Sequence, residues 1–166
     1  LHNGVFRGRG CRKGRGSLGS VLVTSPVVEL RAPCHAEYVS VVRLAVLGLC
    51  GRAPLSYDEV EDLRLAVGEG CASSVQRAAE AGMDDARLTL RATVDESLIV
   101  LEIEDDVPVP PAPEPLEQAV MDVDFNDQQF RVSLMQLLVD EVNIEGLPGG
   151  GQCIRLTKHC VASDGQ

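Results

Sequence analysis

The sequence predicts an α/β fold, a two-layer sandwich in which a mixed β-sheet carries its helices on one face. The segments follow one another as strand, helix, helix, strand, strand, long loop, helix, strand and strand, an order that suits one sheet covered by helices. Ala86–Val94 and Ser97–Asp105 alternate apolar with polar residues, so the sheet buries only one of its faces. Because the chain has 166 residues, of which 3% are aromatic, we expect a single domain with an aliphatic core.

The N-terminal end of the chain differs in composition from the rest. Its first 20 residues hold five basic and no acidic side chains, whereas the remainder holds ten basic and 25 acidic ones. We interpret residues 1–22 as a disordered basic extension, residues 23–160 as the folded domain and residues 161–166 as a tail. A basic arm for nucleic acid stays open for residues 1–22, but the acidic domain argues against direct nucleic-acid binding by the domain itself.

The first predicted elements are a short strand and an apolar helix. Val27–Ala32 has the composition of a strand, and Pro33 ends it. His35–Arg52 repeats apolar residues along one broad face, and the following Ala-Pro pair ends the helix.

The central helix, Tyr57–Ala81, is the best-marked element. Ser56 and Glu59 form a Ser-x-x-Glu capping box at its start, and Gly82 suits its end. Two further glycines, at positions 68 and 70, flank Glu69 inside the helix, where each costs about 1 kcal/mol against alanine. We therefore expect either that some group approaches the backbone closely near Glu69 or that the sequence has departed from a functional ancestor.

A hairpin and a long loop follow the central helix. Ala86–Val94 and Ser97–Asp105 are joined by two acidic residues and form the hairpin. Asp106–Pro115 holds five prolines and starts a loop that runs to about Asn126. We interpret this loop as stiffened by its prolines, so we do not expect it to act as a closing lid.

A third helix and two strands complete the predicted sheet. The helix, Asp127–Glu141, carries an apolar stripe that we interpret as core packing. The stripe consists of Phe130, Leu134, Leu137 and Leu138. Val142–Glu145 and Gln152–Lys158 are short extended segments, and we interpret the glycine cluster Gly149–Gly151 between them as a hairpin turn.

The cysteine, histidine and hydropathy patterns argue against several classes of site. The six cysteines and three histidines form no Cys-x-x-Cys pair and no cluster. We therefore expect no zinc site, and we interpret the cysteines as buried thiols in a reducing cytoplasm. No apolar run approaches ~18 residues, and no apolar stretch follows the basic N-terminus, so we expect neither a membrane span nor a secretory signal.

Three segments carry a family resemblance. They are Leu63–Glu69 (LRLAVGE), Leu138–Val142 (LVDEV) and Arg155–Lys158 (RLTK). Together with the order of elements, they resemble the anti-sigma factor serine kinases of the RsbW type, which belong to the gyrase/histidine-kinase ATPase superfamily with the Bergerat fold. The resemblance covers roughly residues 27–158. It implies the same sandwich fold, with ATP and Mg²⁺ as the ligands of its site.

The central helix of that family reads Glu-Ala-x-x-Asn, which matches EGCAS at residues 69–73. The resemblance implies that Glu69 is the general base that takes the proton from an attacking serine hydroxyl. It places the magnesium ligand at Ser73, where the family has Asn and where a hydroxyl has a shorter reach. Ser74 is an adjacent candidate, but it points about 100° away around the helix. The alternative for Glu69 is an acidic residue that the helix has retained without a catalytic role.

The family's two other nucleotide motifs are altered here. Its Asp-x-Gly-x-Gly motif corresponds to DDVPV at residues 105–109, which keeps the adenine-binding Asp105, with Asp106 beside it, but replaces both glycines by valine. Its glycine-rich phosphate loop falls at QFRV, residues 129–132, where Arg131 is positioned to contact phosphate in place of the missing glycines. The alternative for Asp105 and Asp106 is a solvated strand end.

The resemblance implies a cytoplasmic stress-response regulator of transcription, an anti-sigma factor that sequesters a sigma factor. Partner switching with an anti-anti-sigma protein would control it. Val27–Arg52, rich in Val and Leu, would supply the apolar surface for the sigma factor and for a homodimer. Because the nucleotide motifs are altered, we expect ATP and Mg²⁺ binding to be weakened or lost. The alternatives are an active ATP-dependent serine kinase that phosphorylates the anti-anti-sigma protein, and a domain kept for dimerisation.

Overall fold

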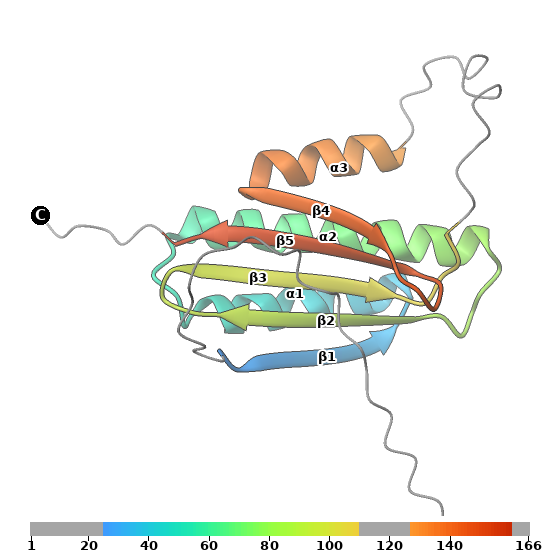
Figure 1. Ribbon diagram of the computed structural model, residues 1–166, viewed down its shortest axis with the longest axis horizontal. Helices are drawn as coiled ribbons and strands as arrows, with labels where there is room; N and C mark the ends of the chain where they lie inside the picture. Colours follow the sequence, from blue (N-terminus) through green and yellow to red (C-terminus); the bar gives the residue numbers. More distant parts are fainter. Residues whose placement is uncertain (1–24, 110–126, 161–166) are drawn as a thin grey trace, which may run out of the picture.

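The computed structural model describes residues 25–109 and 127–160, which form a five-stranded sheet and three helices (Figure 1). The strands lie in the order β1-β2-β3-β5-β4. The elements are β1 (Val27–Pro33), α1 (Ala36–Cys50), α2 (Tyr57–Glu80), β2 (Arg87–Val94), β3 (Leu98–Asp105), α3 (Asp127–Leu138), β4 (Glu141–Gly146) and β5 (Gln152–His159). The predictions for residues 1–22, for residues 110–126 of the proline-rich loop and for the tail at 161–166 lie outside the described residues.

The predicted α/β two-layer architecture is confirmed. Helices α1 and α2 lie along one face of the sheet, and α3 packs against α2 beside β4 (Figure 1). The core between the layers is aliphatic, as the composition predicts. Leu63 and Val67 of α2 and Leu101 and Ile103 of β3 are among its fully buried side chains.

The sheet is antiparallel at every described strand pair, so the prediction of a mixed sheet is wrong in this detail. Two helices connect β1 to β2, which brings the chain back antiparallel to β1. A single helix connects β3 to β4, so these two strands run the same way. They would pair in parallel if they were neighbours, but β5 lies between them. Whether the sheet is mixed or antiparallel therefore depends on the strand order, which no local sequence pattern encodes.

Both ends of α2 carry the predicted signals. The backbone N–H of Ser56 donates to Glu59 Oε2 over 2.8 Å, and the backbone N–H of Glu59 donates to Ser56 Oγ over 3.3 Å. This reciprocal capping box is the one that the sequence predicts. After the helix, Gly82 adopts a φ of +65°, a conformation that glycine reaches without steric cost.

Close packing accounts for the two glycines inside α2. A Cβ atom at Gly70 would lie 2.5 Å from Cδ1 of Ile103 on β3, so the helix backbone sits directly against the sheet. A Cβ atom at Gly68 would lie 3.3 Å from Cδ of Arg43, whose stem crosses from α1. Of the two explanations offered by the sequence, close approach to the backbone is confirmed, and the approaching groups belong to the domain itself.

Helix α3 buries a different side from the one predicted. Leu137 is 83% exposed and Phe130 is 57% exposed, whereas Met135 is fully buried. The interpretation of the predicted stripe as core packing is therefore wrong for Phe130 and Leu137. The helix also ends at Leu138, three residues before the predicted end. Because α3 contacts mainly α2, a narrow strip of its surface is enough to anchor it.

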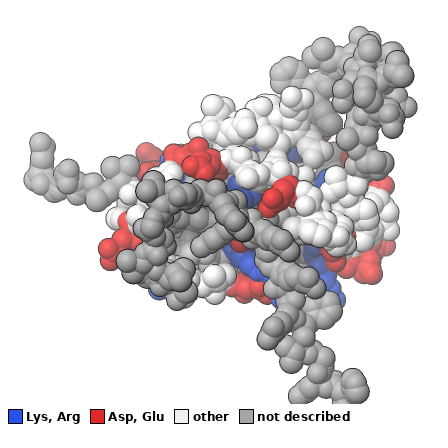
Figure 2. Space-filling view, in the orientation of Figure 1, with Lys and Arg blue, Asp and Glu red and all other residues white. Residues whose placement is uncertain are grey.

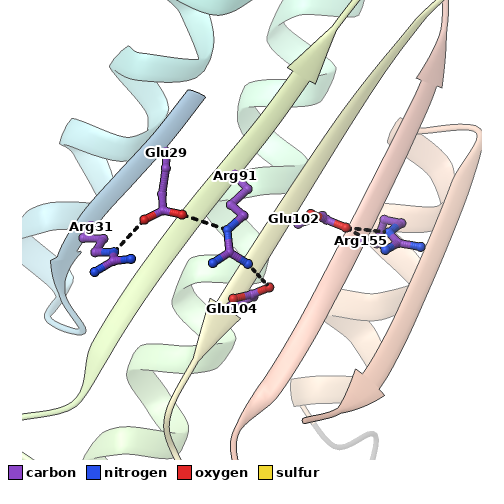
Figure 3. A network of polar contacts seen from close by, with 6 residues as sticks. All are labelled: Glu29, Arg31, Arg91, Glu102, Glu104 and Arg155. Atoms are coloured by element: carbon purple, nitrogen blue, oxygen red, sulfur yellow. Dashed lines mark hydrogen bonds and ion pairs between the residues drawn. The ribbon is translucent and has the colours of Figure 1, made fainter. Parts of the chain in front are cut away.

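The face of the sheet opposite the helices is polar and cross-linked by ion pairs (Figure 3). Arg91 on β2 donates to Glu29 on β1 over 2.8 Å and to Glu104 on β3 over 2.6 Å. Arg155 on β5 pairs with Glu102 on β3 at 2.6 Å. Acidic and basic side chains are interspersed on the side of the molecule shown in Figure 2. These cross-strand pairs confirm the predicted one-sided burial of the hairpin.

Candidate functional site

Glu69, Ser73 and Arg77 lie along one side of α2, because residues four apart in a helix are stacked one turn above another. Glu69 and Ser73 are residues that the sequence singles out. Arg77 is one that it misses; its position eight residues after Glu69 indicates the shared side of the helix but not its partner. The row therefore carries an acid at one end, a hydroxyl in the middle and a guanidinium at the other end.

Arg77 pairs with Asp105, the last residue of β3. The Arg77 Nη2 atom donates to Asp105 Oδ2, and the exposed fractions of the two side chains are 10% and 1%. The same carboxylate oxygen accepts a hydrogen bond of 2.6 Å from Ser74 Oγ. Ser74, which the sequence left as a secondary metal candidate, is therefore a partner of Asp105 in the core of the domain.

The other oxygen of Asp105 is also occupied. Asp105 Oδ1 accepts from the backbone N–H of Val107 over 3.1 Å and from the backbone N–H of Gln152 over 3.3 Å. Burial raises the pKa of Asp105, while the hydrogen bond from Ser74 and the charge of Arg77 oppose that shift. Asp105 is thus a buried carboxylate with donors from α2, from β5 and from the residues that follow β3, rather than the solvated strand end of the alternative interpretation.

Gly151 fixes the backbone at the same place. It adopts a φ of +87°, and a Cβ atom there would lie 1.9 Å from the carbonyl oxygen of Asp105. The turn Gly149–Gly151 joins the antiparallel strands β4 and β5, as the sequence predicts. Its last glycine also packs against the backbone of Asp105, which only a residue without a side chain can do.

Asp106 points elsewhere. Its Oδ1 accepts a hydrogen bond of 2.8 Å from the backbone N–H of Arg87, the first residue of β2. Asp106 therefore ties the end of β3 to the start of β2, and it is not joined to the polar contacts of Asp105. Its predicted place in a ligand site stays a prediction.

Arg131 on α3 pairs with Glu69 at 2.7 Å, and the exposed fractions of the two side chains are 26% and 22%. The structure thus brings together two residues that the sequence assigns to the same site, but it joins them to each other. Ser73, one turn after Glu69, is buried. The carboxylate of Glu69 is thus held by an arginine of the same chain, and its role as a general base stays a prediction.

The chain and its fold can be compared with known proteins. A model of the family described as "Histidine kinase-like ATPase domain" matches residues 32–158, well over half of the chain. The chain belongs to this family. The central helix on which the resemblance depends, and all the elements from α1 to β4, fall inside the matched range.

Curated relatives agree with the resemblance to RsbW. The "Serine-protein kinase RsbW" of Bacillus licheniformis is 33% identical over 78 residues, which cover 47% of this chain and 48% of that protein. The protein of the same name from Bacillus subtilis is 43% identical over 51 residues, 31% of this chain and 32% of that protein. The chain thus spans about half the length, or less, of the curated relatives it matches.

A solved structure supports the fold. The RsbU and RsbW domains of Rv1364c from Mycobacterium tuberculosis match with a TM-score of 0.56 and 14% sequence identity. The match covers 82% of this chain and 33% of that one. At this level of identity the likeness concerns the fold alone.

The residues present fit ATP and Mg²⁺ poorly. Each oxygen of Asp105 already accepts two hydrogen bonds within the protein, and Glu69 is paired with Arg131. Ser73 offers one short hydroxyl where Mg²⁺ prefers several oxygen ligands. Within the described ranges, no three His, Cys, Asp or Glu side chains gather as a metal site. No catalytic step through ATP follows from this geometry. No helix in the part that the structure describes is long and apolar enough to cross a membrane.

Proposed function

We propose that this member of the histidine kinase-like ATPase family is an anti-sigma regulatory factor that sequesters a sigma factor in the cytoplasm. Partner switching with an anti-anti-sigma protein would release the sigma factor. The observation that carries this proposal is the concentration of exposed apolar side chains on β1 and α1. They are Val28, Val41, Leu44 and Leu47, and Leu44 is 62% exposed.

This surface has the composition of a protein-binding face. Val41, Leu44 and Leu47 recur every three residues along α1, so they share one side of the helix. Beside them a hollow of about 220 Å³ lies between β1 and α1. It is lined by Val28, Leu30, Ala45, Gly48, Leu49 and Leu90. Exposed apolar side chains grouped in this way are typical of interaction sites, and we assign this surface to the sigma factor and to a homodimer contact.

The second candidate function is an active serine kinase that phosphorylates the anti-anti-sigma protein. The specific observation in its favour is that Glu69 remains on α2 at about one-fifth exposure, where a substrate hydroxyl can approach. The ion pair with Arg131 and the filled hydrogen-bond positions of Asp105 favour the binding protein instead. We therefore propose that nucleotide binding and kinase activity are weakened or lost.

Partner capture by surface variants tests the proposed function. Tagged chains carrying Leu44→Asp or Leu47→Asp would be mixed with each sigma factor encoded in the same genome. We expect both variants to lose the capture that the unaltered chain shows, because each puts a charge into the apolar face. The matched control is Leu137→Asp on α3, which alters an even more exposed leucine and should leave capture intact. Capture that survives both α1 variants would contradict the proposal.

Thermal melting with ATP and Mg²⁺ separates the two candidates. A ligand present at 100 times its Kd stabilises a protein by about 2.7 kcal/mol, which raises Tm visibly. We expect no rise at millimolar ATP. A saturable rise, together with phosphate transfer that Glu69→Ala abolishes, would favour the kinase.

A further inference from the structure

The hollow between β1 and α1 is lined by apolar residues. They are Val28, Leu30, Ala45, Gly48, Leu49 and Leu90. Val28 and Gly48 are exposed, so the hollow reaches the surface of the domain. Its volume of about 220 Å³ lies below the roughly 300–1,000 Å³ of sites that bind drug-sized molecules. The hollow therefore suits one small apolar group, such as a single side chain.

Gly48, in the last turn of α1, has no steric explanation within the domain. Cβ atoms at Gly68 and Gly70 would lie 3.3 Å and 2.5 Å from the side chains of Arg43 and Ile103. A Cβ atom at Gly48 would meet no atom of the described part of the chain within 4 Å, its own helix turn aside. Because a helix disfavours glycine relative to alanine, the fold alone gives no reason for this residue. A group that fills the hollow from outside gives one, since any side chain at position 48 would compete with it.

We propose that the hollow is a socket for one large apolar side chain of the sigma factor, of the class of leucine, methionine or phenylalanine. This assignment rests on the proposed function, because the socket lies within the surface assigned to the sigma factor. Val28 belongs both to that surface and to the lining of the hollow. Leu44, 62% exposed, lies one turn before Gly48 on the same side of α1.

The chemistry of the lining decides which kind of group enters. A charged or hydrogen-bonding group would lose its water in the hollow without gaining a partner from the lining side chains. An apolar side chain loses nothing there, and its burial favours binding. With Leu44 beside the hollow, the inserted side chain would be surrounded by apolar contacts that exclude water, which is the usual setting of a residue that dominates an interface.

Filling the hollow from within the chain tests the proposal. Leucine is a strong helix former, so Gly48→Leu should fold and should place its own side chain in the socket. We expect this variant to melt no lower than the unaltered chain and to bind the purified sigma factor with a Kd raised about tenfold or more, the effect of losing one buried apolar side chain. The matched control is Gly48→Ala, which leaves most of the hollow empty and should keep the Kd within about twofold.

The sigma factor supplies the second half of the test. Its exposed leucine, methionine and phenylalanine residues would be changed to alanine one at a time. We expect one of these changes to raise the Kd about tenfold with the unaltered chain and to have no further effect with Gly48→Leu. Such non-additivity would identify the side chain that enters the socket.

The possible outcomes separate this proposal from the proposed function. If Leu44→Asp loses sigma-factor capture but Gly48→Leu binds as tightly as the unaltered chain, the socket is refuted and the proposed function stands. If the unaltered chain captures no sigma factor, the proposed function fails and the socket fails with it. If Gly48→Leu disrupts only self-association, measured by sedimentation equilibrium, the occupant is a second copy of the chain and the proposal is wrong. Should Gly48→Leu not fold, Gly48→Met takes its place in the same titrations.

Discussion

Substituting the two glycines of α2 by alanine should have opposite effects on stability. Both changes remove a helix-interior glycine, so each gains about 1 kcal/mol of helix propensity. At Gly70 the new Cβ would lie 2.5 Å from Cδ1 of Ile103, a contact that forces a fully buried side chain to shift. Such overpacking costs about 1–3 kcal/mol, so we expect Gly70→Ala to lower the free energy of unfolding by roughly 1 kcal/mol.

Gly68→Ala is the matched control, two residues away in the same helix. Its Cβ would lie 3.3 Å from Cδ of Arg43, part of a flexible stem that can move by a few tenths of an ångström. We expect the propensity gain to prevail and the free energy of unfolding to rise by about 0.5–1 kcal/mol. Equilibrium urea unfolding followed by far-UV circular dichroism measures both changes with one protocol.

A compensating variant makes the reasoning refutable. Ile103→Val removes the Cδ1 atom that Gly70→Ala would meet, and alone it should cost about 0.5–1.5 kcal/mol. In the Gly70→Ala background the same change should cost nearly nothing, which gives a coupling of about 1 kcal/mol between the two sites. If Gly70→Ala proves more stable than the unaltered chain, or the two changes are additive, the steric explanation of this glycine is wrong.

Three other predictions follow from single observations. Burial raises the pKa of Cys34 to about 11 and that of Cys71 to about 12, from a value of 9.0. Their contribution to stability is therefore complete below pH 9 and is lost as the pH rises from 9 through 11 for Cys34 and through 12 for Cys71, which chemical unfolding at stepwise pH should reveal. Ser56→Ala should lower the free energy of unfolding by about 1 kcal/mol, because it removes the capping box; an unchanged urea midpoint would contradict this. Glu69→Ala should change sigma-factor affinity by only a few tenths of a kcal/mol in a calorimetric titration, and a tenfold loss would place Glu69 in the interface.

The sequence predicts what depends on neighbouring residues. The capping box of α2 needs only Ser56 and Glu59, three positions apart, and the structure forms it as expected. The hairpin of β2 and β3 follows from alternation within two adjacent segments. In both cases the information lies within one short, continuous stretch of the chain, and no contact from elsewhere in the chain overrides it.

The sequence does not predict features that depend on how distant segments of the chain pack together. The exposed side of α3 could not be read from its apolar stripe, because Phe130 and Leu137 are as apolar as Met135, and only the position of α2 selects the buried side. The antiparallel sheet depends on β5 lying between β3 and β4. The partner of Asp105 is 28 residues away and that of Glu69 is 62 residues away, so neither arginine is visible as a partner in the sequence.

The two ion pairs explain how the two acids that the resemblance assigns to a nucleotide site can persist in a chain that, as we propose, binds nucleotide weakly or not at all. Asp105 and Glu69 each have an arginine of the same chain as counter-charge. Removing one member of a buried pair leaves a charge without compensation and costs about 3–5 kcal/mol, whereas replacing both members together can be nearly neutral. A single substitution at Asp105 or Arg77 is therefore disfavoured by stability alone, without any ligand to retain it. Glu69 and Arg131 are more exposed, so their pair is worth less. Of the two acids, Asp105 is the one whose retention the fold itself enforces.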